Sequence, residues 1–177
     1  AAGESVFLMG PSGCGKSTLL SIIGCILRPD QGSVELLGRS IADMSDTDRA
    51  HFRRDHIGFV FQRFHLVRGL SALENVKIPL SLAGKSGTEA QQRAEELLVQ
   101  VGLEEKMSLS SGQLSSGQCQ RVALARALAC DPEIILADEP TASLDAENGR
   151  SAMELLSNLA RQGGKTLVVV THDERIV

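Results

Sequence analysis

Apolar residues occur along this chain in short, strand-sized runs, with segments of helical spacing between them. The apolar runs predict strands at residues 5–9, 33–37, 57–61, 133–137 and 166–171. The intervening spacing predicts helices at residues 16–27, 47–54 and 147–161. Because strands that alternate with helices are typical of a mainly parallel sheet, the expected fold class is α/β.

Residues 71–129 interrupt this alternation, since they contain no convincing strand. Thr88 and Gln91 have the spacing of a capping box, which predicts the start of a helix. One face of that helix is apolar and consists of Ala90, Ala94, Leu97, Leu98 and Val101. We therefore expect an α-helical subdomain at residues 71–130, inserted into a core formed by residues 1–70 and 131–177.

Composition excludes several classes of protein. The chain has 177 residues, of which 42% are hydrophobic, enough for one sizeable core. A net charge of −4 provides no broad basic surface, so nucleic acid is not an expected partner. The apolar runs are far shorter than the roughly 20 residues of a membrane helix, and no signal peptide is readable, so a cytoplasmic location is expected. The four cysteines lack the spacing of a zinc site.

Residues 10–18 read Gly-Pro-Ser-Gly-Cys-Gly-Lys-Ser-Thr and match the phosphate-loop pattern G-x-x-x-x-G-K-[ST]. The match lies between a predicted strand and a predicted helix, where backbone amides and a helix N-terminus surround a polyphosphate. Lys16 is expected to neutralise the β and γ phosphates of ATP, and Ser17 to bind Mg²⁺. The predicted nucleotide-binding residues here are Gly10, Pro11, Ser12, Gly13, Cys14, Gly15, Lys16, Ser17 and Thr18. The glycines are expected to supply backbone angles that other residues avoid.

Two adjacent carboxylates, Asp138 and Glu139, end the apolar run at residues 133–137. Neighbouring side chains on a strand point to opposite sides, so the two acids are expected to have different roles. We assign Asp138 to the magnesium ion and Glu139 to the water that attacks the γ phosphate. Strands also end in solvated acids, and only the phosphate loop makes the catalytic interpretation the stronger one.

Residues 114–121, Leu-Ser-Ser-Gly-Gln-Cys-Gln-Arg, form a serine-rich turn before an apolar helical segment. On its own this is an ordinary helix cap. The turn resembles the LSGGQ signature of ATP-binding-cassette (ABC) proteins, and the resemblance extends over essentially the whole chain. It implies ATP contacts from Ser115, Ser116, Gly117 and Gln118. Ser116 replaces the first glycine of the signature, so reduced signature function is expected.

Three further residues match motifs of the same family, in the family's order. Gln62 matches the Q-loop glutamine, which implies a contact to magnesium or water and coupling to a membrane subunit. Asp145 matches the D-loop, which implies a contact across a dimer, although an Asp in this position is also an N-cap. His172 matches the switch histidine, which implies catalysis with Lys16 and Glu139 through a hydrogen bond to the γ phosphate.

Residues 61–66, 73–80 and 136–141 resemble the export-type group that includes lipoprotein-release, macrolide-export and cyanobacterial glycolipid-export ATPases. The resemblance implies a Mg²⁺-dependent ATPase that forms a homodimer and drives export through separate transmembrane permease subunits, at the inner face of the membrane. Family domains extend on both sides of this stretch, so the core is expected to be truncated at both ends. Two alternatives stay open: a cassette ATPase outside transport, and a nucleotide-dependent switch module with little turnover.

Overall fold

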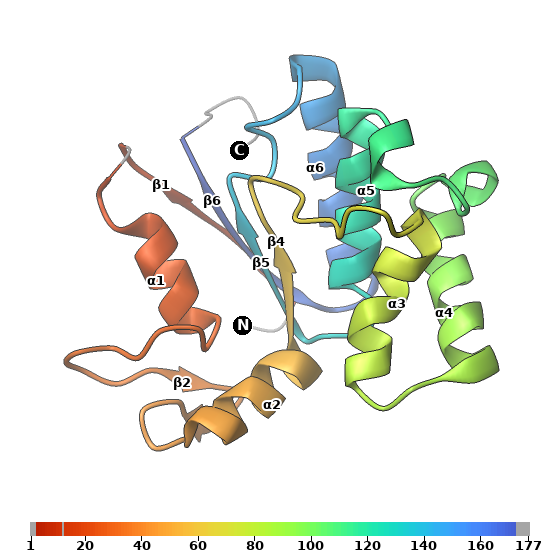
Figure 1. Ribbon diagram of the computed structural model, residues 1–177. Coiled ribbons are helices and arrows are strands. Elements are labelled where there is room, and N and C mark those ends of the chain that lie inside the picture. Colours follow the sequence, from red (N-terminus) through yellow and green to blue (C-terminus); the bar gives the residue numbers. More distant parts are fainter. Residues whose placement is uncertain (1–2, 12, 173–177) are drawn as a thin grey trace.

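The computed structural model describes residues 3–11 and 13–172 (Figure 1). Ser12, from the predicted phosphate loop, and residues 173–177 lie outside that description. Four parallel strands form the main sheet, in the order β1 (Ser5–Met9), β6 (Thr166–Thr171), β5 (Ile134–Asp138) and β4 (Ile57–Val60). All four point the same way, so their carboxyl ends meet at one edge (Figure 1). The predicted α/β class is confirmed.

Alternation along the central strands divides the apolar core between the two faces of the sheet. Ile134 and Leu136 of β5 belong to one buried cluster, whereas Ile135 and Ala137 belong to another. Because side chains on a strand alternate between faces, both faces of this sheet are covered, which explains its nearly continuous apolar sequence.

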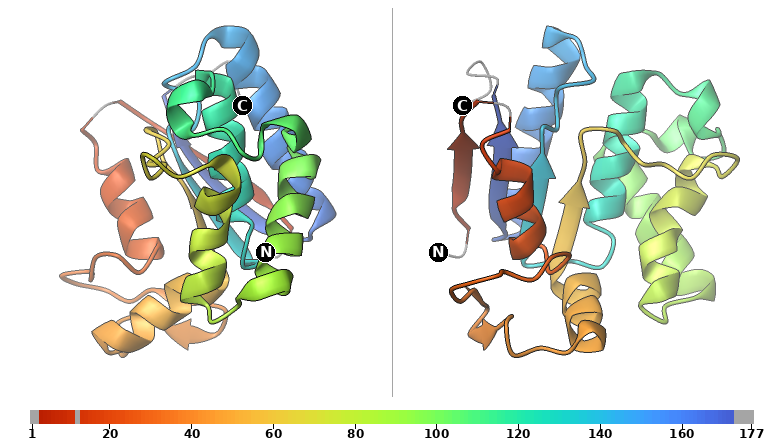
Figure 2. Two further views of the ribbon diagram at one scale, coloured as in Figure 1. Left: turned by 45° about the vertical axis from the view of Figure 1, so that its right-hand side comes forward. Right: turned by 60° about the vertical axis from the view of Figure 1, so that its left-hand side comes forward.

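Helices on the first face are α1 (Lys16–Ile23) and α2 (Asp46–His56), which bury Leu20 and Phe52 in the same cluster as Leu136. On the opposite face lie α5 (Ser116–Ala127) and α6 (Ala146–Gln162). We call the first the phosphate-loop face and the second the signature face. Figure 2 shows them on the two sides of the sheet.

The predicted helical segment forms α3 (Ala72–Leu82), α4 (Gly87–Gln100) and α5, with two short 3₁₀ turns, η1 (Glu104–Lys106) and η2 (Ser111–Gln113). α3 and α4 pack against the outer side of α5, away from the sheet (Figures 1 and 2). The predicted apolar face of α4 is fully buried there. Within the described residues, no helix is long and apolar enough to cross a membrane.

The structure corrects the predicted start of α4. The helix begins at Gly87 after Ser86, and Thr88 does not cap it. The Gln91 side chain instead accepts a hydrogen bond from Lys77 and donates one to the Glu95 carboxylate. Thr88 and Gln91 therefore have the spacing of a capping box but do not form one, since Thr88 already lies inside the helix and Gln91 bonds other side chains.

Two other elements are shorter than predicted. α1 ends at Ile23, and after the capping residue Gly24 the chain turns at Cys25, which takes a left-handed backbone (φ 57°). A Cβ on Gly24 would lie 2.0 Å from the ring of Phe59, so the ring packs directly against this glycine. The strand expected at residues 33–37 is only β2 (Glu35–Leu36), which pairs antiparallel with β3 (Arg39–Ser40) as a separate ribbon. The remaining predicted boundaries agree with the structure to within two residues.

Candidate functional site

The phosphate loop follows β1 and leads into α1, as the sequence predicts. Gly13 and Gly15 have left-handed backbones (φ 83° and 93°), which glycine adopts without strain. Gly10 meets a different requirement: a Cβ there would lie 3.1 Å from the Cys14 sulfur. A Cβ at the first glycine would thus make a tight contact, and the expectation that all three glycines supply unusual φ angles is wrong for Gly10.

Lys16, the first residue of α1, folds back over this loop. Its ammonium donates hydrogen bonds to the carbonyl oxygens of Gly10 (2.7 Å) and Pro11 (2.9 Å). The described loop residues Pro11 and Gly13–Gly15 are exposed. Together with the amides at the start of α1, this ammonium concentrates positive charge at an open helix N-terminus, which suits a phosphate group.

Ser17 and Asp138 are 121 positions apart in the chain but adjacent in space. The Ser17 hydroxyl donates a hydrogen bond to Asp138 Oδ1 over 3.0 Å. Asp138 ends β5 and continues the side of Ile134 and Leu136, which is the side that faces α1. The register of the strand thus places this carboxylate beside the phosphate loop.

Glu139 turns away from Asp138 and faces the end of β6. Its amide donates to the Val170 carbonyl (2.8 Å), and its backbone is left-handed (φ 47°). The side chain, 15% exposed, bonds His172 Nδ1 (2.8 Å). A left-handed backbone is costly for a residue with a Cβ, and such strain occurs most often at functional sites. Its occurrence at Glu139 supports a functional role for this residue. The two acids have different partners, as the alternation predicts.

The segment after β4 carries Gln62, which is exposed at the same edge of the sheet. Its carbonyl accepts a hydrogen bond from Ser143 Oγ (2.9 Å), so the predicted Q-loop and the turn before α6 are joined. Further along, the guanidinium of Arg126 in α5 donates to the carbonyls of Phe64 (2.7 Å) and His65 (2.6 Å). Burial lowers the pKa of Arg126.

The signature turn is a complete capping box at the start of α5. Ser115 Oγ accepts from the amide of Gln118 (3.3 Å), and the Gln118 side chain accepts from the amide of Ser115 (2.9 Å). Ser116 is the first helical residue, and its helical conformation accommodates a Cβ without backbone strain. Whether Ser116 reduces signature function stays a prediction.

The structure does not bring the signature turn to the phosphate loop of the same chain. The loop leads into α1 on one face of the sheet, and the turn leads into α5 on the other (Figure 2). Asp145 lies on the signature face, where it caps α6 by accepting from the Asn148 amide (2.9 Å). Hydrogen bonds from Asn148 hold the pKa of Asp145 below its usual range.

Sequence reasoning missed two residues that join these motifs. Arg126 ties α5 to the segment after Gln62, and Asn148 lies between Asp145 and Gly117. Neither has a signal in the sequence, because a single arginine in an apolar helix and an asparagine in a first helical turn are both ordinary until their neighbours in space are known.

Comparison with known proteins explains why the phosphate loop, the acidic pair and the signature turn occur together in one chain. Residues 1–142 match the family described as ABC transporter. The chain belongs to the ABC transporter family. A solved ABC structure, the dimeric ATP-binding cassette MJ0796 in a post-hydrolysis state bound to ADP and phosphate, superimposes with a TM-score of 0.89 and 49% identity, over 99% of this chain and 78% of that one.

Two relatives extend the comparison of this cassette. The uncharacterized ABC transporter ATP-binding protein Rv2564 of Mycobacterium tuberculosis is 51% identical over all of this chain and 53% of its own length. The macrolide export ATP-binding/permease protein MacB of Photorhabdus laumondii is 46% identical over 99% of this chain and 27% of its own length. The predicted likeness to macrolide-export proteins is confirmed. The chain spans about half of Rv2564, so the activity and partners of a whole protein are matters for proposal.

Proposed function

We propose that this cassette binds and hydrolyses ATP with Mg²⁺ and drives export through membrane partners. The observation that carries the proposal is the convergence of the phosphate loop, the Ser17–Asp138 pair and the Glu139–His172 pair at one edge of the sheet. In open α/β sheets, ligands bind outside the carboxyl ends of the strands. Phosphoryl transfer needs positioned charge more than a covalent nucleophile, and these groups supply it.

Each pair has a distinct task in this proposal. Lys16 exchanges its carbonyl partners for the β and γ phosphates. Glu139 orients water at the γ phosphate, with His172 holding the carboxylate and contributing a hydrogen bond to that phosphate. Gln62, at the edge of the sheet, contacts the metal or the attacking water.

Magnesium fits the residues that are present. A hydroxyl and a carboxylate oxygen at 3.0 Å are hard donors of the kind Mg²⁺ prefers. Among the described residues no cluster of three or more His, Cys, Asp or Glu side chains forms a metal cage. That agrees with an ion held by Ser17, Asp138 and substrate phosphates, since Mg²⁺ usually keeps few protein ligands. When bound, Mg²⁺ neutralises charge that develops on the phosphates.

Two copies are required, because one chain presents its phosphate loop and its signature turn on opposite faces. We place ATP between the loop of one copy and the signature residues Ser115 to Gln118 of the other, with Asp145 crossing the dimer. The dimeric state of MJ0796 supports this arrangement. Residues 71–130 would act as a lobe that moves against the core of residues 1–70 and 131–177 as ATP binds and is hydrolysed.

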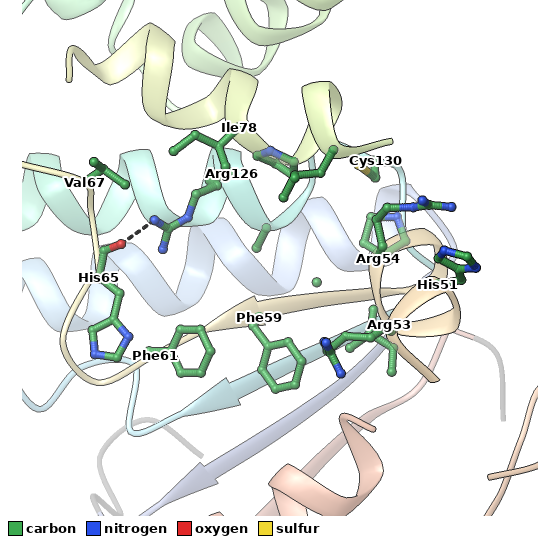
Figure 3. A pocket seen from close by; sticks show the side chains of 17 residues that line it. His51, Arg53, Arg54, Phe59, Phe61, His65, Val67, Ile78, Arg126 and Cys130 are labelled. Atoms are coloured by element: carbon green, nitrogen blue, oxygen red, sulfur yellow. Dashed lines mark hydrogen bonds between the residues drawn. The ribbon is translucent and has the colours of Figure 1, made fainter. Parts of the chain in front are cut away.

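A groove of about 590 Å³ is the proposed docking site for a transmembrane permease subunit. Phe59, Phe61 and His65 stack in a row along one wall, with ring centroids 5.2 and 5.0 Å apart (Figure 3). Ile78 of α3 lies across from them, and Arg54 lies at one end (Figure 3). Such a groove suits a short amphipathic helix from the cytoplasmic side of a membrane protein.

The permease is favoured over other occupants because MacB is named as an ATP-binding/permease protein, and this chain matches 27% of it. Docking there would hold the cassette at the inner face of the membrane. It would also act directly on the segment after Gln62, because Arg126 bonds His65 at the wall of the groove (Figure 3).

The test compares magnesium-dependent ATP turnover of the purified protein with that of Glu139→Gln, while light scattering follows dimer formation at saturating ATP. We expect the variant to lose turnover and to accumulate as an ATP-bound dimer. A wild-type protein that binds ATP without turnover would overturn the ATPase proposal in favour of a switch module. An ATP turnover rate that does not change when a candidate permease subunit is added would favour a cassette ATPase outside transport.

A further inference from the structure

The first turns of α5 and α6 touch at Gly117 and Asn148. A Cβ built on Gly117 would lie 2.9 Å from Asn148 Oδ1 and 3.2 Å from its Cγ. The 2.9 Å separation is shorter than a real Cβ contact, so any side chain at position 117 would force the Asn148 carboxamide to shift. The signature glycine thus has a partner within its own chain as well as a proposed role toward nucleotide.

Asn148 is itself held firmly in place. Its Nδ2 donates to Asp145 Oδ2 over 2.6 Å, while its backbone amide donates to Asp145 Oδ1 over 2.9 Å. The two bonds use both oxygens of the capping carboxylate, so the carboxamide cannot rotate without losing one of them. Its remaining oxygen is therefore fixed against Gly117.

The same turn of α6 rests on the catalytic segment through the next residue. A Cβ on Gly149 would lie 3.3 Å from Cβ of Thr141, a buried residue two positions after Glu139. The turn at residues 148–149 accordingly has the signature helix on one side and the chain that leaves Glu139 on the other. In front of the contact is a cavity of about 450 Å³, lined by Ser115, Gly117, Gln118, Arg121, Lys106 and Asn148.

We propose that Asn148 is a positioning residue that sets the signature turn relative to the Asp145 turn, so that both meet the partner copy's nucleotide as one surface. The inference rests on the proposed function, since it concerns the composite ATP site. Asn148 is exposed on the surface of one copy, so its role lies in the geometry that it imposes and not in filling the core.

The primary variant is Asn148→Ala, which keeps the backbone amide that donates to the capping carboxylate of Asp145 and removes only the carboxamide. We expect ATP affinity of the monomer to stay within about twofold, because the phosphate loop is on the other face. In a Glu139→Gln background, ATP-dependent dimerisation should weaken about tenfold, and turnover of the single variant should recover as protein concentration rises. Asn158→Ala, an exposed asparagine on the same helix, is the matched control and should change neither quantity.

A double-variant cycle makes the contact itself testable. Gly117→Ala forces a methyl group against Asn148, and removing the carboxamide relieves that clash. We therefore expect the double variant Gly117→Ala/Asn148→Ala to dimerise better than Gly117→Ala alone, which a general loss of stability would not produce. Asn148→Asp, which keeps the shape but cannot donate to Asp145, should behave no better than Asn148→Ala.

The outcomes separate this inference from the proposed function. If the Glu139→Gln protein fails to dimerise with ATP, the composite site is wrong. If it dimerises, and Asn148→Ala dimerises equally well with strictly additive effects in the cycle, Asn148 is not a positioning residue although the function stands. An Asn148→Ala protein that loses monomer ATP affinity to the same extent as dimerisation would also overturn the inference, because that pattern indicates general damage.

Discussion

The phosphate-loop face and the signature face of the sheet differ in how they are packed. In α1 the buried residue is Leu20 alone, whereas seven of the twelve residues of α5 are buried. The apolar cluster on the phosphate-loop face is the smaller one and includes Phe52 of α2, with Leu36 of β2 packed against it. On the other face a single cluster runs from the sheet through α5 to α3 and α4.

The difference follows from what each face has to present. The phosphate-loop face brings reactive side chains together from distant parts of one chain, such as Ser17 with Asp138, and they need an open, polar edge. The signature face presents mainly a capped helix start, whose direction depends on rigid packing behind it. The phosphate-loop face therefore depends on convergent strand ends, whereas the direction of the signature turn depends on the packing behind it.

The largest expected effect comes from a substitution that affects the phosphate-loop face alone. Lys16→Ala removes the ammonium that neutralises the phosphates, and turnover should fall about 1,000-fold with loss of ATP binding. Binding of a fluorescent ATP analogue and steady-state turnover measure the two effects. Lys85→Ala, an exposed lysine paired with Glu89, is the control and should match the wild type. Retained ATP affinity in Lys16→Ala would contradict the assigned role.

Truncation of one buried leucine on each face should separate stability from binding. Leu20→Ala and Leu98→Ala each remove a fully buried side chain and should lower the free energy of unfolding by about 3 kcal/mol. Only Leu20→Ala should also weaken ATP binding, because Leu20 anchors the helix that follows the phosphate loop. Denaturant unfolding and ATP titration at a temperature where both variants are folded give the comparison. Equal losses of affinity would show that the faces are not independent.

Removal of the signature cap should have a smaller effect, confined to the second face. Ser115→Ala deletes the hydroxyl that caps α5 and is proposed to meet the partner's nucleotide, so ATP-dependent dimerisation should weaken about tenfold. Ser110→Ala removes the equivalent serine from a second capping box, at η2, and is a matched control. It should cost about 1 kcal/mol of stability, as Ser115→Ala does, but leave dimerisation unchanged. Similar dimerisation defects in the two variants would show that Ser115 acts only as a helix cap.

The smallest expected effect concerns the Lys165–Asp131 ion pair (2.7 Å), which joins the turns that lead into β6 and β5. Its hydrogen bond holds the pKa of Asp131 below the usual range. A lowered pKa in the folded state means that the stabilisation is present above the unfolded-state pKa and is lost as pH falls through the folded value. Asp131→Asn should therefore remove a small part of the acid sensitivity of unfolding, below about 1 kcal/mol because the carboxylate is largely exposed. An unchanged acid-unfolding curve would show that the pair adds nothing.

Sequence patterns predicted the core better than the edges of this protein. The parallel strands and the phosphate loop could be located because their apolar runs and glycine spacing are local properties. The C-terminal end of α1 and the length of the strand at 33–37 could not be located, since α1 ends in a turn at Gly24 and Cys25 and the strand pairs only as a short ribbon outside the main sheet. Likewise Thr88 is not a cap, because α4 already begins at Gly87 and the Gln91 side chain bonds Lys77 instead.

By itself the sequence determined the α/β class, the position of the phosphate loop and the order of the motifs, because each is encoded in residues that are close together in the chain. Only the tertiary structure decided that Ser17 meets Asp138, that Glu139 meets His172, and that the signature turn lies on the opposite face with Asn148 against Gly117. The reason is physical: the register of parallel strands and the crossing of two helix ends fix these contacts across long separations in the chain, and no local spacing records them.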